Sequence, residues 1–93
     1  MDELPFLDER VALLGAIASP NRYRILKLLC DRESDVATLL AELRVPQSTM
    51  SRDLSVLRMH GIVSLRKEAT RHFYSCRHDG VKEIMKILDE VLP

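Results

Sequence analysis

The clearest hydrophobic pattern in the chain runs from residue 45 to residue 60. Its apolar positions fall three to five residues apart, a spacing that gives a helix one buried stripe; they are Val45, Met50, Leu54 and Leu57. The opposite positions carry hydroxyl, amide and guanidinium groups: Gln47, Ser48, Thr49, Ser51, Arg52, Ser55 and Arg58. Such groups suit base edges and phosphates when a helix enters a DNA major groove. The pattern favours a recognition helix over an ordinary surface helix that happens to be rich in Ser and Thr.

Three shorter helices are predicted before this stretch. The first has apolar positions at helical spacing from Leu7 and ends near Ala18. The second begins at Ser19-Pro20, an N-cap followed by a proline at the first helical position. The third begins at Ser34-Asp35, and Arg44-Val45 forms the tight turn into the recognition helix.

The periodicity changes after His60. Gly61 is predicted to cap the recognition helix, and residues 62–65 and 72–76 are predicted to form a hairpin with a polar tip. A last amphipathic helix is predicted from Val81, Ile84, Met85, Leu88, Val91 and Leu92. This order predicts a mainly α domain with a β-hairpin wing (α+β), a winged helix-turn-helix arranged α-α-α-α-β-β-α.

The length of 93 residues predicts a single domain over residues 1–93, because a chain this short cannot form two cores. A monomer of this size has little stability to spare, so we expect an additional face to be buried in an oligomer.

Charge is unevenly distributed although the formal net charge is zero. Residues 44–77 contain seven Lys and Arg against two acidic residues, and the remaining residues carry the balancing negative charge. A local positive surface is what phosphate binding requires. The distribution therefore predicts double-stranded DNA as a partner.

The compartment is predicted from the cysteine count and the N-terminus. Two cysteines are too few for a disulfide scaffold. The first ten residues are acidic where a signal peptide would be basic, and no apolar run reaches the length of a membrane span. We therefore expect a cytoplasmic protein with reduced thiols and no membrane partner.

Three segments together resemble the ArsR/SmtB family of bacterial transcriptional repressors. They are A-I-A-S-P-N-R-Y-R-I-L-K-L-L (16–29), P-Q-S-T-M-S-R-D-L-S-V-L-R-M-H-G-I-V (46–63) and R-K-E-A-T-R-H-F-Y-S (66–75). The resemblance implies a homodimer built from the first and last helices, which binds operator DNA and is released by an inducer. The two-fold axis of such a dimer predicts a palindromic operator. The dimer residues so implied are Leu7, Val11, Leu14, Val81, Ile84, Met85 and Leu88. The expected DNA contacts are Gln47, Ser48, Thr49, Ser51 and Arg52 in the major groove and Lys67, Thr70 and Arg71 of the wing on the backbone or minor groove.

The sequence departs from the inducer sites that the resemblance implies. Residues 34–38 lack the Cys-x-Cys of the metal-sensing members, and a second family metal site is reduced to His78. Lys27 and Leu92 stand where the sulfur-responsive branch carries its two cysteines. We therefore expect no metal at the standard family sites and no dithiol of the known kind.

Cys76, His78, Asp79 and His72 form the one group of nearby potential ligands in the sequence. They could supply a soft metal, and His78 could lower a thiol pKa; the alternative is a partly buried thiol with solvated neighbours. Any thiol or metal response is predicted to run through Cys76, because Cys30 is expected to be a small core residue. A Cys30–Cys76 redox pair requires Cα atoms within about 7 Å. A regulator with no metal or thiol inducer remains the alternative.

Asp53 places a carboxylate on the recognition helix. It could accept a hydrogen bond from a cytosine amino group, but its position past the first turn favours an intramolecular pair with a nearby Arg.

An enzyme is not expected, because the sequence has no glycine-rich phosphate loop and no catalytic triad in motif context. A winged-helix module for protein interaction is the remaining alternative to a DNA-binding regulator. The two differ in salt dependence, which is steep for DNA binding and shallow for apolar docking.

Overall fold

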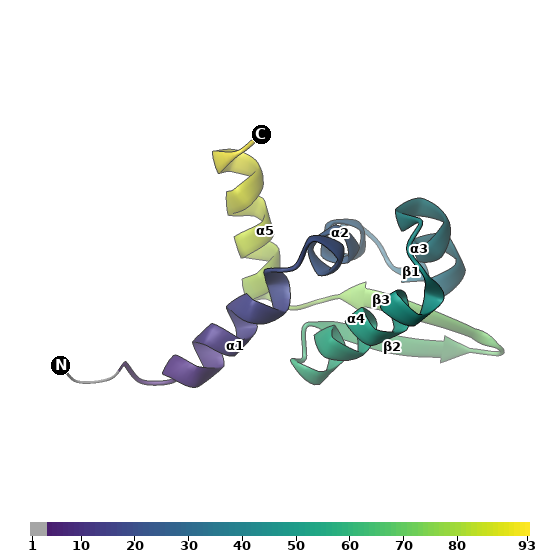
Figure 1. The fold of residues 1–93 in the computed structure, drawn as a ribbon, viewed down its shortest axis with the longest axis horizontal. Coiled ribbons are helices and arrows are strands. Elements are labelled where there is room, and N and C mark those ends of the chain that lie inside the picture. The colour runs from purple at the N-terminus through teal and green to yellow at the C-terminus, as the bar shows by residue number, and fades with distance from the viewer. Residues whose placement is uncertain (1–3) are drawn as a thin grey trace.

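Five helices and three strands follow one another in the structure, a computed structural model that describes residues 4–93 (Figure 1). The elements are α1 (Leu7–Ile17), α2 (Pro20–Leu29), β1 (Ser34–Asp35), α3 (Val36–Leu43), α4 (Gln47–Met59), β2 (Val63–Glu68), β3 (Arg71–Cys76) and α5 (Asp79–Val91). The predicted winged helix-turn-helix is confirmed, with one added strand, β1.

The predicted helix starts are confirmed by their caps. The Ser19 hydroxyl accepts a hydrogen bond from the backbone N–H of Arg22 at 3.5 Å, and Pro20 is the first residue of α2. The Asp35 carboxylate accepts from the backbone N–H of Thr38 at 2.9 Å at the start of α3. Each cap satisfies an N–H group that has no partner within its helix.

The end of α4 also follows the prediction. Gly61 has a φ of 68°, a left-handed conformation that glycine adopts without a Cβ clash. Its N–H donates to the carbonyl of Arg58 at 2.9 Å, and the N–H of Ile62 donates to the carbonyl of Leu57 at 2.9 Å. These two bonds form a Schellman motif, which turns the chain from α4 into the wing.

The wing is an antiparallel hairpin in which β2 pairs with β3 from Val63 opposite Cys76 to Glu68 opposite Arg71. Strand β1, which the sequence pattern does not predict, pairs with the other edge of β3 and gives the sheet order β1-β3-β2. Two residues leave no periodicity to detect, and the pairing joins segments almost 40 residues apart.

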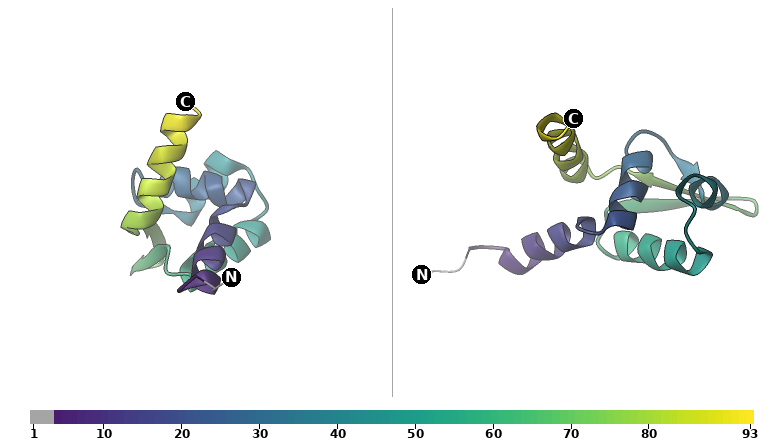
Figure 2. Two further views of the ribbon diagram at one scale, coloured as in Figure 1. Left: turned by 90° about the vertical axis from the view of Figure 1, so that its left-hand side faces the viewer. Right: turned by 45° about the horizontal axis from the view of Figure 1, so that its top comes forward.

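The core lies where α2, α3, α4, the base of the hairpin and the first half of α5 meet. Its largest fully buried apolar side chains are Ile25, Leu26, Leu29, Leu39, Met50, Leu54, Leu57, Ile62 and Val81. Figures 1 and 2 show α1 extending toward one end of the long axis and the hairpin tip at the other, with α5 projecting to one side between them. Within residues 4–93, no helix is both long and apolar enough to cross a membrane.

Candidate nucleic-acid interface

The outer face of α4 presents polar side chains because the inner face is anchored in the core. Met50, Leu54 and Leu57 are buried. All the predicted contacts on α4 are exposed except Thr49, which is half-buried; the exposed ones are Gln47, Ser48, Ser51 and Arg52. The helix therefore offers hydroxyl, amide and guanidinium groups from a fixed backbone.

A hollow of about 490 Å³ separates α4 from the wing. Gln47, Ser51 and Ser55 line it from α4, and Thr70 and Arg71 line it from the end of the hairpin. The structure thus brings two predicted α4 contacts and two predicted wing contacts onto one concave surface. The other predicted contacts, Ser48, Thr49, Arg52 and Lys67, lie outside this lining.

Both arginines of the wing are already paired with acidic groups. Arg66 donates to Glu33 at 2.7 Å and to Glu68 at 2.6 Å. Arg71 donates to Asp35, the residue that caps α3. The guanidinium hydrogen bonds lower the pKa of both Glu33 and Asp35. These pairs tie the hairpin to the segment before α3.

The aromatic ring of Phe73 supports both of these cations. The guanidinium carbon of Arg66 lies 4.6 Å from the ring centroid, and that of Arg71 lies 4.9 Å from it. Such distances suit cation–π attraction.

The net positive charge of residues 44–77 is therefore partly neutralised in the folded protein. Glu33 and Asp35 lie outside that window in the chain but neutralise two of its arginines. Within residues 4–93, the basic residues of the window that take part in no ion pair are Arg44, Arg58, Lys67 and Arg77.

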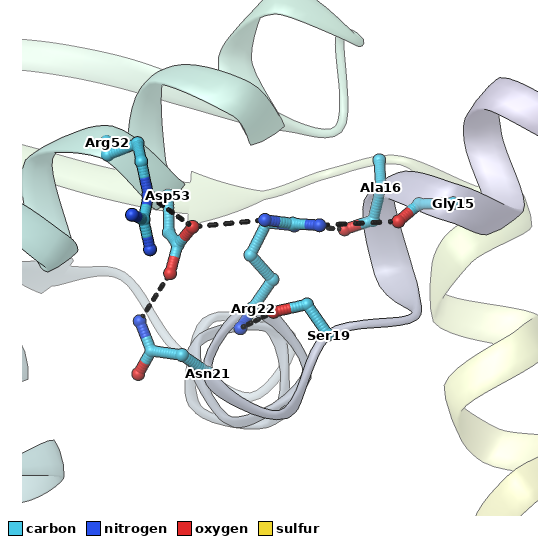
Figure 3. Close-up of polar contacts among 7 residues, drawn as sticks. All are labelled: Gly15, Ala16, Ser19, Asn21, Arg22, Arg52 and Asp53. Atoms are coloured by element: carbon cyan, nitrogen blue, oxygen red, sulfur yellow. Dashed lines mark hydrogen bonds and ion pairs between the residues drawn. The ribbon is translucent and has the colours of Figure 1, made fainter.

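Asp53 lies in an intramolecular network, and its side chain is 2% exposed (Figure 3). It accepts hydrogen bonds from Arg22 Nη1 at 3.1 Å and Asn21 Nδ2 at 2.7 Å, with Arg52 Nε at 3.6 Å. Burial opposes ionisation, but the bonds from Asn21 and Arg22 outweigh it and lower the pKa of Asp53. The favoured interpretation of Asp53 is confirmed, although its closest arginine is on α2.

The exposed ends of α1 and α5 form a separate apolar surface. Val11 and Leu14 of α1 are 59% and 56% exposed, and Leu88 of α5 is 36% exposed. A hollow of about 500 Å³ lies between these helices and the start of α2; its lining includes Leu14, Tyr23, Ile84 and Leu88. Three of the seven predicted dimer residues line this hollow, namely Leu14, Ile84 and Leu88, and two more, Leu7 and Val11, are exposed on α1.

The prediction that Val81 and Met85 contact the partner subunit is wrong. Val81 and Met85 are 0% and 4% exposed, because the first half of α5 packs into the core of its own protomer. The apolar residues that α5 does expose lie in its second half and just beyond it: Ile87, Leu88, Val91 and Leu92.

The thiol through which any response is predicted to run, Cys76, is buried in the protomer. Cys76 is 2% exposed, at the end of β3, and Cys30 is half-buried. Burial, together with a hydrogen bond to the Cys76 thiol, raises the pKa of Cys30 to about 12. The chain therefore places its two thiols together, but in a setting that keeps Cys30 protonated.

The predicted metal ligands do not form a site. His78 is the N-cap of α5, and its Nδ1 accepts a hydrogen bond from the backbone N–H of Val81 at 3.1 Å. In the part of the chain that the structure describes, no three His, Cys, Asp or Glu side chains are grouped to hold a metal ion.

Comparison with known proteins agrees with this geometry. Residues 19–64 match the arsR family of bacterial regulatory proteins. An uncharacterised HTH-type transcriptional regulator of Methanocaldococcus jannaschii is 41% identical over 85 residues, which cover 90% of this chain and 96% of the relative.

Two solved structures show the same fold. HlyU from Vibrio cholerae superposes with a TM-score of 0.89 at 34% identity, covering 97% of this chain and 98% of HlyU. HlyU of Vibrio cholerae is described as a transcriptional activator. Mb0332 from Mycobacterium bovis, described as a homodimeric winged helix-turn-helix DNA-binding domain, has a TM-score of 0.83 at 28% identity, covering 92% of this chain and 80% of that fragment. By its sequence and its winged helix-turn-helix fold, the chain belongs to the arsR family of DNA-binding transcriptional regulators.

Proposed function

We propose that the protein is a homodimeric repressor that binds a palindromic operator in double-stranded DNA. The observation that carries the proposal is the concave surface shared by α4 and the wing, with Gln47 and Ser51 facing Thr70 and Arg71. A helix with exposed polar side chains next to a hairpin fits the major groove and the adjoining backbone. The proposal includes no catalytic step, and it places the protein in the cytoplasm with the DNA it regulates.

The apolar surface of α1 and α5 supports the homodimer. Exposing an apolar hollow lined by Leu14 and Leu88 to water is unfavourable in free energy, so a partner that covers it stabilises the protein. The similar protein Mb0332 is described as homodimeric. A two-fold dimer presents two copies of α4 related by the same axis, and a palindrome repeats its half-sites about such an axis. The palindromic operator follows from this symmetry.

Two kinds of contact are proposed. The α4 residues Gln47, Ser48, Thr49, Ser51 and Arg52 read base edges, while Lys67, Thr70 and Arg71 hold the phosphate backbone. Lys67 is exposed and has no ion-pair partner within residues 4–93. Arg71 has to exchange its pair with Asp35 for a phosphate, so we expect it to contribute less than Lys67.

Two experiments test the proposal. The protein first selects its preferred sequence from a random DNA library, and its affinity for that sequence is then measured. Arg52→Ala is expected to cost about 1–3 kcal/mol on that sequence and to relax preference at one position. Lys67→Ala is expected to weaken binding to every sequence and to reduce the salt slope by about one. Lys86→Ala, which removes an exposed lysine of α5, is the matched control and is expected to change neither the affinity nor the salt slope. Unaltered binding in both test variants would contradict the proposed surface.

A reporter gene placed behind the selected sequence tests the sign of regulation. We expect expression to fall when the protein is present. Rising expression would assign the activator role that is described for HlyU. No inducer acting on Cys76 is proposed, because that thiol is buried.

A further inference from the structure

The guanidinium of Arg22 completes the C-terminal end of α1. A helix leaves its last carbonyls without intrahelical partners. In α1 the carbonyl of Leu14 accepts from Ala18 N–H at 2.9 Å. The carbonyl of Ala16 accepts from Arg22 Nε at 2.7 Å, and that of Gly15 accepts from Arg22 Nη2 at 3.4 Å. The last turn of α1 has no basic residue of its own, so α2 supplies the cap.

The same guanidinium reaches the recognition helix. Its Nη1 lies 3.1 Å from Oδ1 of Asp53 on α4, and Asn21 Nδ2 donates to Oδ2 of that carboxylate at 2.7 Å. Figure 3 shows Arg22 between Asp53 on one side and the carbonyls of Gly15 and Ala16 on the other. Three separate donor nitrogens of one planar group are thus used, two toward α1 and one toward α4.

Apart from this guanidinium, α1 is held to the body of the protomer by core packing near its C-terminal end, where Leu13 is half-buried against the core. Of its residues only Ala16 and Ile17 are buried, and both lie in the last turn. Figure 2 shows the rest of the helix projecting away from the core. The direction of α1 therefore depends on how its C-terminal end is held. A guanidinium is suited to hold it because its donors have a fixed planar arrangement.

We propose that Arg22 and Asp53 are positioning residues that fix the angle between α1 and α4, and through it the half-site spacing that the dimer accepts. The inference rests on the proposed function, in which α1 contributes to the dimer surface and α4 enters the major groove. An angle fixed in each protomer sets the separation of the two recognition helices. Moving a half-site by one base pair displaces it by about 3.4 Å along the duplex, so a rigid dimer discriminates against that change.

Two substitutions test this inference in the full chain. Asp53→Asn keeps the shape of the side chain and removes its charge, and Arg22→Lys keeps the charge and removes the fork of donors. Each is measured on the palindrome that the wild type selects, and on versions with one base pair inserted or deleted between the half-sites. Arg32→Lys is the matched control, because Arg32 forms an exposed pair with Glu42 at 3.4 Å and does not contact α1 or Asp53.

We expect the wild type and Arg32→Lys to prefer the selected spacing by about tenfold or more, a factor comparable to that of one mismatched base pair. In Asp53→Asn and Arg22→Lys this ratio is expected to approach one, with the dimer dissociation constant unchanged. A loss of protomer stability alone would not change the ratio. The spacing ratio therefore separates positioning from a structural role.

The inference is overturned if the variants fold and keep the spacing ratio of the wild type. If Asp53→Asn does not fold, Arg22→Lys decides, and loss of folding in both overturns it by showing that the network serves stability alone. A wild-type protein that selects no palindrome removes the proposed function itself. A wild type that selects one while the variants keep its spacing ratio removes only the inference about Arg22 and Asp53.

Discussion

Replacing Leu14 by alanine tests whether the α1 and α5 surface is the dimer interface. Burying a leucine side chain completely is worth about 1.5–3 kcal/mol, and Leu14 is 56% exposed in the protomer. Covering that exposed part stabilises a dimer by roughly 0.8–1.7 kcal/mol per copy, or about 2–3 kcal/mol for the two copies that a two-fold axis brings together. We expect Leu14→Ala to lose most of this and to raise the dimer dissociation constant by about 10- to 100-fold.

Sedimentation velocity over a dilution series measures that constant. Alanine is the best helix former, so α1 should keep its helix and the protomer its fold, which circular dichroism at one concentration checks. Met59→Ala is the control, because Met59 is 84% exposed at the end of α4 and does not line the hollow between α1, α5 and the start of α2. Equal dissociation constants for wild type and Leu14→Ala, within twofold, would refute the assignment of this surface.

Further predictions concern stability and pH. Leu57→Ala, at a site that is 0% exposed, should lower the free energy of unfolding by about 2–5 kcal/mol in urea titrations. Because burial raises the pKa of Cys30 from 9.0 to about 12, the free energy of unfolding should fall as pH rises above 9; a Cys30→Ala variant that kept the same slope would contradict this. The network lowers the pKa of Asp53 below 3.8, so its stabilisation is present above that pH and lost in acid. Asp53→Asn should accordingly show a shallower acid dependence.

The sequence predicted elements whose signals are local. The stripe of Met50, Leu54 and Leu57 located α4, because a helical period is contained within a dozen residues. Gly61 located its end, because a left-handed residue after a helix favours glycine. The exposed polar face of α4 followed from the same period, so all its predicted contacts except the half-buried Thr49 are exposed.

Features that depend on distant residues could not be predicted in this way. The sequence pointed to an arginine partner for Asp53, but only the packing of α2 against α4 selects Arg22. Val81 and Met85 share a helical stripe with Leu88, and periodicity cannot divide such a stripe between a protomer core and a subunit interface. For Cys76, the nearby His78 suggested reactivity, whereas its burial depends on how β3 and α5 pack.

The pairing of Arg66 and Arg71 with acidic groups affects how the protein distributes between its specific site and non-specific chromosomal DNA. A genome offers about 10⁶–10⁹ competing non-specific sites, which attract a protein chiefly through unpaired cations. Here Glu33, Glu68 and Asp35 already occupy the two wing arginines, and the whole chain has no net charge. We therefore expect bulk DNA to retain fewer of these molecules than a count of basic residues implies, so that fewer copies are needed to occupy a specific site.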